Sequence, residues 1–329
     1  MSKQNKAGYL PNRVYYQLYM RFYSNGNVVM DTSASSHWQE CARHFEVFPN
    51  GENNFKLAGY GFGSSGSSSL PARVFDWVGN MLHLAYLGLP GLRNDIREAK
   101  GVVQRMGLAF SQDAFRQVCT LNLLVRQMQT SKAPDRILII GDGHGILSAL
   151  LHTQYPDARI FLADLGSVLF FQAYHLGKAF QDAPQALTDE YVDGHDSAVF
   201  NFCPADRLDT LPSDELDLAI NVASMQEMDS DVTARYFTLL RQHNTRLFYC
   251  CNRLEKRLGG GEITRFMDYP WSPADEHLID GPCPWHQWFF GLGSSPHVKL
   301  WKFPVPFMHR YEGTHWHRLT RLERKTIND

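Results

Sequence analysis

Short apolar runs alternate with amphipathic stretches between residues 136 and 253, and this alternation restricts the possible fold more than any other feature. The apolar runs predict five strands, over 136–140, 158–164, 198–206, 216–224 and 245–253. Stretches with apolar residues every three or four positions predict helices over 145–155, 166–180 and 230–243. Strands without polar alternation are buried on both faces. The segment therefore predicts an α/β fold, with a parallel sheet covered by helices on both sides.

The flanks of this segment have a different texture. Residues 72–128 contain two helical patterns, so residues 1–130 are predicted to be a mainly helical region that covers the site, contributes to substrate binding or supports oligomerisation. Within it, "YGFGSSGSSSLP" (60–71) is either a flexible connector or a loop that closes over a ligand. Residues 131–329 form the predicted sheet domain. There, 254–296 are expected to be irregular, and 297–307 with 314–322 to form a closing antiparallel pair.

Charge and cysteine usage exclude several classes of protein. The 329-residue chain has a formal net charge of −2, so no general attraction to nucleic acid or anionic membranes is expected. Its six cysteines include no CxxC pair. The first residues lack the apolar stretch of a signal peptide, and no run approaches the roughly 20 apolar residues of a membrane span. These features predict a cytoplasmic protein with reduced thiols.

The first predicted strand ends in a glycine-rich loop, "RILIIGDGHG" (136–145). In doubly wound sheets, ligands bind outside the carboxyl ends of the strands, near the reversal of strand order. A dinucleotide site requires G-x-G-x-x-G, with its third glycine where Ile146 stands, and a P-loop requires a Gly-Lys-Ser/Thr ending that is absent. The loop is G-x-G-x-G. A nicotinamide dehydrogenase and a plain strand-to-helix turn remain the alternatives.

This spacing, in this position, resembles the first motif of the class I S-adenosylmethionine-dependent methyltransferases. The resemblance covers roughly residues 131–323 and implies a doubly wound, mostly parallel, seven-stranded Rossmann-like sheet with S-adenosylmethionine as cofactor. Asp164 would accept hydrogen bonds from the ribose hydroxyls, and Asp206 would lie against the adenine amine. An acid common in the family is replaced by Ile139, and Asp142 stands inside the loop instead. The implied cofactor-binding residues are Gly141, Asp142, Gly143, Gly145, Asp164, Leu165, Asp206 and Asn221.

Further stretches are similar to a bacterial group described as sugar O-methyltransferases. They are "GDGHGILSALLHTQYPDARIFLADL", "NVASMQEMD" followed by "YF", "FYCCNR" and "FMDYPW". This resemblance implies O-methylation of a sugar-like or other small polar hydroxyl acceptor. N-methylation of a small amine, amino acid or guanidine is one alternative, and a non-catalytic cofactor-binding subunit is another. The charge balance and the lack of an N/D-P-P-Y/F segment disfavour nucleic acid as the acceptor, and aromatic residues in the first 80 positions make a homodimer plausible.

Methyl transfer to a hydroxyl requires alignment, exclusion of water and removal of a proton. Glu227 and His286 are the catalytic candidates. Glu227 is a base, a partner for a cationic acceptor, or only a carboxylate at a helix start. His315 and His317 lie on one side of a predicted strand, but no third metal ligand is evident, so we predict an exposed strand face and no metal. The predicted substrate-binding residues are Gln226, Asn252, Arg253, Tyr269, Trp271 and Trp285.

Overall fold

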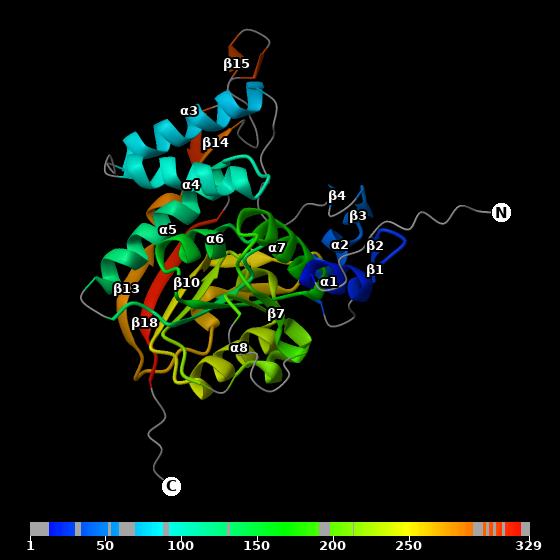
Figure 1. Ribbon diagram of the computed structural model, residues 1–329. Helices are drawn as coiled ribbons and strands as arrows, with labels where there is room; N and C mark the ends of the chain where they lie inside the picture. The colour runs from blue at the N-terminus through cyan, green and yellow to red at the C-terminus, as the bar shows by residue number, and fades with distance from the viewer. Residues whose placement is uncertain are drawn as a thin grey trace, which may run out of the picture.

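The structure is a computed structural model (Figure 1). It describes residues 13–29, 34–51, 54–58, 70–87, 92–129, 132–190, 198–212, 214–291, 299–300, 303–304, 307–310 and 313–323. An eight-stranded sheet lies at its centre, in the order β13-β18-β10-β9-β5-β6-β8-β7. Its strands are β5 (Arg136–Ile140), β6 (Arg159–Asp164), β7 (Gln185–Leu187), β8 (Phe200–Pro204), β9 (Leu218–Val222), β10 (Leu247–Arg253), β13 (Glu276–Pro282) and β18 (His315–Arg321).

The sheet is mostly parallel, as predicted. The six neighbouring strands β10, β9, β5, β6, β8 and β7 are parallel to one another. The strand β18 is antiparallel to both of its neighbours, β10 and β13. The chain passes outward from β5 to β6 and β8, and then returns to add β9 and β10 on the other side of β5. This reversal leaves a crevice at the carboxyl ends of β5 and β9, which is where doubly wound sheets bind ligands.

Helices cover both faces of the sheet because alternate residues of each buried strand point to opposite sides. Ile137 and Ile139 of β5 belong to one core cluster, together with residues of α6 (Ile146–Gln154) and α7 (Gly166–Ala179). Leu138 and Ile140 belong to a second cluster, with residues of α8 (Ser230–Gln242). Figure 1 shows α8 on the side of the sheet away from α6 and α7. The predicted apolar runs thus fill two layers of core.

Two expectations about the sheet are corrected. It has eight strands rather than seven, because the three-residue β7 adds a parallel edge beside β8. The antiparallel partner of β18 is β13, not residues 297–307. β13 reads "EHLIDGP" and is an edge strand with largely exposed side chains, so it carries no apolar run that sequence reasoning would detect. Within 297–307, the described residues form short pairs, β15 with β16 and β17 with β14.

The N-terminal region is less helical than predicted. Its helices are α1 (Val14–Phe22), α2 (Ser36–Ala42), α3 (Leu70–Leu87), α4 (Arg93–Arg105) and α5 (Gln112–Met128). Four short strands, β1 (Tyr23–Ser24), β2 (Asn27–Val28), β3 (Glu46–Pro49) and β4 (Phe55–Ala58), form a separate antiparallel sheet. The turn between β1 and β2 is Asn25-Gly26, with both φ angles positive, a hairpin signal that the sequence interpretation missed. The stretch 60–71 lies outside the described residues except for the first two residues of α3.

The N-terminal elements share the core of the sheet domain. Tyr15 of α1 and Phe55 of β4 pack edge-on against Tyr174 of α7, and Phe55 also contacts Phe170. The Tyr174 hydroxyl accepts a hydrogen bond from the Phe55 backbone N–H at 3.1 Å. A boundary near residue 130 remains a prediction. Across it, α1 and β4 are joined to α7 by apolar and aromatic contacts.

Short elements complete the described structure. The remaining strands are β11 (Glu255–Arg257), β12 (Ile263–Arg265), β14 (Trp288–Gly291), β15 (Lys299–Leu300), β16 (Phe303–Pro304) and β17 (Phe307–Arg310). The 3₁₀ turns are η2 (Thr188–Glu190), η3 (Ala205–Thr210), η4 (Met225–Glu227), η5 (Phe266–Asp268) and η6 (Pro284–His286). None of the helices in the described ranges has both the length and the apolar composition needed to cross a membrane.

Candidate functional site

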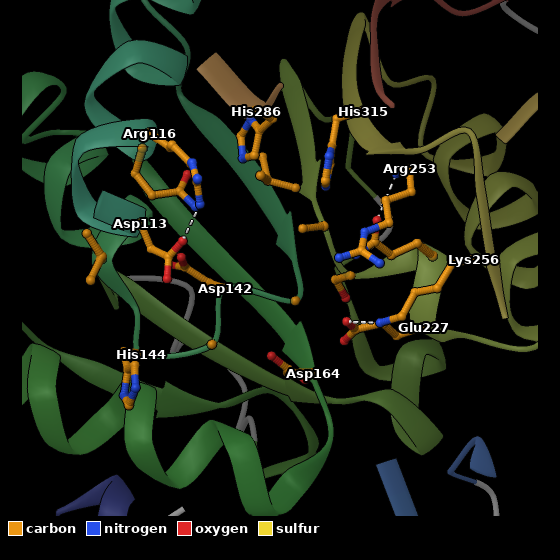
Figure 2. A pocket seen from close by; sticks show the side chains of 18 of the residues that line it. Asp113, Arg116, Asp142, His144, Asp164, Glu227, Arg253, Lys256, His286 and His315 are labelled. Carbon is orange, nitrogen blue, oxygen red and sulfur yellow. Dashed lines mark hydrogen bonds and ion pairs between the residues drawn. The ribbon is translucent and has the colours of Figure 1, made fainter. Parts of the chain in front are cut away.

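A cavity of about 240 Å³ lies at the crevice between β5 and β9 (Figure 2). Its walls come from the glycine loop after β5, the end of β6, the segment after β9, the end of β10, and parts of α2, α5 and η6. Eight residues predicted as functional line it: Gly141, Asp142, Gly143, Asp164, Gln226, Glu227, Arg253 and His286. Sequence and structure therefore point to the same edge of the sheet.

The glycine loop needs glycine for two separate reasons. The φ angles of Gly141, Gly143 and Gly145 are +74°, +59° and +81°, in the left-handed region that other residues rarely adopt. In addition, a Cβ atom at Gly141 would lie 1.9 Å from the Ser224 Oγ. The loop is held close to the segment after β9, and its bare backbone forms one wall of the cavity.

Asp142 holds the loop to the helix that follows. Its carboxylate accepts hydrogen bonds from the backbone N–H groups of Leu147 (3.1 Å) and Ser148 (2.8 Å), and from the Ser148 hydroxyl. Burial raises the pKa of Asp142 to about 6, although these hydrogen bonds act to lower it. The carboxylate is therefore committed to the first turn of α6, which has Gly145 as its N-cap.

Asp164 ends β6 and is 8% exposed. One carboxylate oxygen accepts the Leu165 backbone N–H at 2.8 Å, and the other accepts the Gln172 amide at 2.7 Å. Burial raises the pKa of Asp164 to about 7. A hydrogen bond from the Gly143 backbone also acts to lower this pKa. The carboxylate keeps acceptor capacity for a polyhydroxyl ligand in the cavity.

The segment after β9 is held by a buried amide network. Asn221 donates to the Ile140 carbonyl at 2.8 Å and accepts from the Asn252 side chain at 2.8 Å. The Gln226 side chain accepts the Arg253 backbone N–H at 2.7 Å. Ala223, which lines the cavity, has a φ of +57°, a strained value for a residue with a Cβ. Asn221 and Asn252 are fully buried and do not line the cavity, so they shape its wall from behind.

Glu227 lies between two basic side chains (Figure 2 shows the Lys256 side). One carboxylate oxygen is 2.5 Å from the Lys256 Nζ, and the other is 3.5 Å from the His37 Nε2. Hydrogen bonds from His37 to Cys41 and to Glu227 raise the pKa of His37 to about 9. The Ser35 hydroxyl donates to the Glu227 carbonyl at 2.6 Å, and Trp38 lines the cavity. The sequence interpretation missed these contributions of α2 and β11, because no local pattern indicates that residues so far apart in the chain meet at Glu227.

Helix α5 supplies another wall that was not predicted. Asp113, Arg116 and Gln117 line the cavity. Arg116 pairs with Asp113 at 2.8 Å and donates to the Trp288 carbonyl at 3.0 Å. Figure 2 shows this pair at the edge of the pocket near His286. In the sequence, Arg116 resembles any polar residue of an amphipathic helix.

His315 and His317 are buried, which corrects the predicted exposed strand face. They are 3% and 6% exposed, because β18 lies inside the sheet between β10 and β13. His315 lines the cavity, and its ring stacks on that of His286 with centroids 5.3 Å apart. Histidines from β18 and η6 therefore meet at the wall of the cavity (Figure 2).

The other predicted residues do not line this cavity. They are Gly145, Leu165, Asp206, Asn221, Asn252, Tyr269, Trp271 and Trp285. Asp206 is exposed in η3. Tyr269 and Trp271 pack on Phe237 of α8, on the opposite side of the sheet from α6 and α7. Trp285 is buried and donates to the Thr120 hydroxyl of α5 at 3.2 Å. Most of the expected aromatic wall is therefore core.

Solved structures with a similar fold are known, although no protein-family model and no curated protein matches the chain. One similar structure is coclaurine N-methyltransferase bound to N-methylheliamine and SAH (TM-score 0.36, 11% identity, 51% of this chain). The present chain spans about half (50%) of that protein's length.

Two further similar structures are bacterial. They are an S-adenosylmethionine-dependent methyltransferase from Clostridium acetobutylicum ATCC 824 (TM-score 0.39, 13% identity) and an rRNA methylase from Escherichia coli (TM-score 0.36, 14% identity). The match to the Clostridium structure covers 61% of this chain and 89% of that structure. The match to the Escherichia coli structure covers 70% of this chain and 76% of that structure.

Proposed function

We propose that this protein is an S-adenosylmethionine-dependent methyltransferase that acts on a hydroxyl group of a small polar molecule. The observation that carries the proposal is the meeting of two elements in one cavity. The bare backbone of Gly141 and Gly143 forms one wall, and the buried carboxylate of Asp164 ends the neighbouring strand. A glycine cradle accommodates the close approach of a nucleoside ligand, and the acid matches the two hydroxyls of its ribose.

The cavity residues divide the expected chemistry between them. Bound S-adenosylmethionine supplies an electrophilic methyl group, and the glycine loop and Asp164 would hold it. In the same cavity, the Glu227 carboxylate would accept the proton of the acceptor hydroxyl. Lys256 and His37 orient this carboxylate by pairing with its two oxygens. Arg253 and Gln226 line the same cavity and would position the acceptor.

The net charge of −2 favours a small acceptor over nucleic acid. Differential scanning fluorimetry and calorimetry with S-adenosylmethionine, S-adenosylhomocysteine and NAD test the cofactor. Binding to the native state raises the melting temperature by mass action. We expect a rise with the first two ligands and none with NAD. A rise with NAD alone would overturn the proposal, and mass gain with amines but not hydroxyl compounds would reassign the acceptor atom to nitrogen.

Cofactor affinity is expected to depend on pH through Asp164. Its pKa is about 7 in the free protein, and ribose hydroxyls donate best to the ionised carboxylate. Binding would therefore lower this pKa and release a proton below about pH 7. The dissociation constant should be nearly flat above that pH and should rise by up to about tenfold per pH unit below it. Calorimetry in buffers of different ionisation enthalpy measures both effects, and a pH-independent affinity with no proton release would contradict this role.

Replacing Glu227 with glutamine is expected to reduce turnover by about 100-fold or more, because the amide cannot accept a proton. Cofactor affinity should change little, since the proposed contacts with the cofactor are made by Asp164 and the glycine loop and not by Glu227. The measurements are turnover by mass gain and cofactor binding by calorimetry. Glu262→Gln, a change at an exposed carboxylate, is the matched control. Unchanged turnover in Glu227→Gln would remove this residue from the reaction.

A further inference from the structure

Three potential metal ligands meet behind the histidine wall of the cavity. They are Cys251 on β10, Cys283 just after β13 and His286 at the end of η6, and all three are buried. One donor atom from each lies within 4.8 Å of the other two. The "CPWH" turn brings Cys283 and His286 to the same side, because a 3₁₀ turn returns after three residues. The sequence interpretation considered only His315 and His317 as metal ligands, and neither belongs to this group.

The distances match the edges of a coordination tetrahedron. The His286 Nδ1 lies 3.3 Å from the Cys283 Sγ and 3.6 Å from the Cys251 Sγ. Ideal tetrahedral bonds from zinc to sulfur and imidazole nitrogen place these atoms about 3.5 Å apart. Convergence on two sulfurs is the arrangement expected around a shared ion.

Further polar groups lie beside the three ligands. Around the ligands, the Tyr249 hydroxyl lies 3.2 Å from the His317 Nδ1, and His317 is paired with Cys251 across the two strands. Such outer groups orient ligands in metal sites.

We propose that Cys251, Cys283 and His286 bind a zinc ion. Two sulfurs and one imidazole form a soft ligand set that selects zinc over magnesium or calcium. Three protein ligands leave a fourth position open. His286 also lines the cavity, so the ion would lie at its wall. Coordination through the Nδ1 leaves the other ring nitrogen of His286 as a donor, which assigns proton removal to Glu227. The zinc site does not depend on the proposed methyl transfer.

Metal content and cobalt substitution test the site without any assay of activity. The full chain is purified with a thiol reductant, and its zinc is measured by elemental analysis. After removal by a chelator, the chain is titrated with Co²⁺, whose bonds to thiolates give a charge-transfer band in the near ultraviolet. We expect one zinc per chain and a band of two-thiolate intensity. In Cys251→Ser and Cys283→Ser, zinc affinity should fall by at least about 100-fold, with the band reduced by half.

Cys250→Ser is the matched control. Cys250 precedes Cys251 on β10 and is equally buried, but it belongs to the core cluster on the other side of the sheet. This variant should retain the zinc and the full cobalt band. If Cys251→Ser fails to fold, the zinc content of Cys283→Ser tests the site instead, because Cys283 lies outside the strand. Absence of stoichiometric zinc in the wild-type chain, a disulfide between Cys251 and Cys283 in the reduced preparation, or equal loss in Cys250→Ser would overturn the proposal.

Discussion

Replacement of Asp164 with asparagine is expected to weaken the binding of S-adenosylmethionine by at least about 100-fold. Hydrogen bonds to a charged acceptor contribute roughly 1.5–3 kcal/mol each, and the carboxylate would receive two from the ribose. About 2.7 kcal/mol corresponds to 100-fold in affinity. The amide keeps the size of the side chain but loses the charge and one acceptor oxygen. Isothermal titration calorimetry measures the change, and an unaltered dissociation constant would show that the ribose lies elsewhere.

The stability of the ligand-free protein separates lost binding from lost folding. The pKa of Asp164 is raised in the folded chain to about 7, so folding favours the protonated form. The native state therefore loses stability as the pH rises from about 4, the pKa in an unfolded chain, to about 7. Because asparagine is neutral at every pH, Asp164→Asn should lack this loss of stability between pH 4 and pH 7 while it remains folded. Asp182→Asn, at an exposed carboxylate outside the cavity, should change neither quantity.

Replacement of Gly141 with alanine should destabilise the fold and abolish ligand binding together. The new Cβ would meet the Ser224 Oγ at 1.9 Å, and a φ of +74° is strained for alanine. Overpacking and backbone strain each cost about 1–3 kcal/mol. The melting temperature should fall by roughly 5–15 °C. Any backbone shift that relieves the clash would also move the wall of the cavity.

Gly101→Ala is the matched control for this change. Gly101 lies within α4, where an added Cβ would meet only the Arg105 guanidinium, at 3.8 Å. Alanine is favoured over glycine inside a helix, so this variant should be more stable by about 0.5–1 kcal/mol. Removing the Ser224 side chain in Gly141→Ala/Ser224→Gly should recover part of the lost stability. Equal melting temperatures for Gly141→Ala and wild type would show that the loop tolerates a side chain.

The predicted strands and helices between residues 136 and 253 agree with the structure because each has a regular pattern of buried apolar residues. In β5, the four apolar residues of "RILII" are buried on both faces of the sheet, so each of them carries the signal. β13 escaped prediction for the opposite reason, since an edge strand with exposed side chains has no apolar run. The four short N-terminal strands also lack an apolar run that would predict them. Their clearest signal in the sequence is the Asn25-Gly26 turn.

The aromatic residues of 269–288 show where composition misleads. The sequence predicts that Tyr269, Trp271 and Trp285 bind substrate, but Trp271 packs on Phe237 and Phe248 against the core. A sequence pattern cannot distinguish a ring that faces a cavity from one that faces another helix. Both environments require a large apolar surface with occasional polar partners. Only the tertiary structure decides whether a given ring faces the cavity or another helix.

The sequence by itself determined the doubly wound sheet, the glycine loop at its edge, and the placement of Asp142, Asp164, Gln226, Glu227 and Arg253 near that edge. These follow from local periodicity and from the order of elements along the chain, which act over a few residues. The tertiary structure alone decided that His37 and Lys256 flank Glu227, that Arg116 of α5 lines the cavity, and that Cys251 meets Cys283 and His286. These contacts join segments that are distant in sequence, and long-range packing between the two sides of a core leaves no periodic trace in either segment.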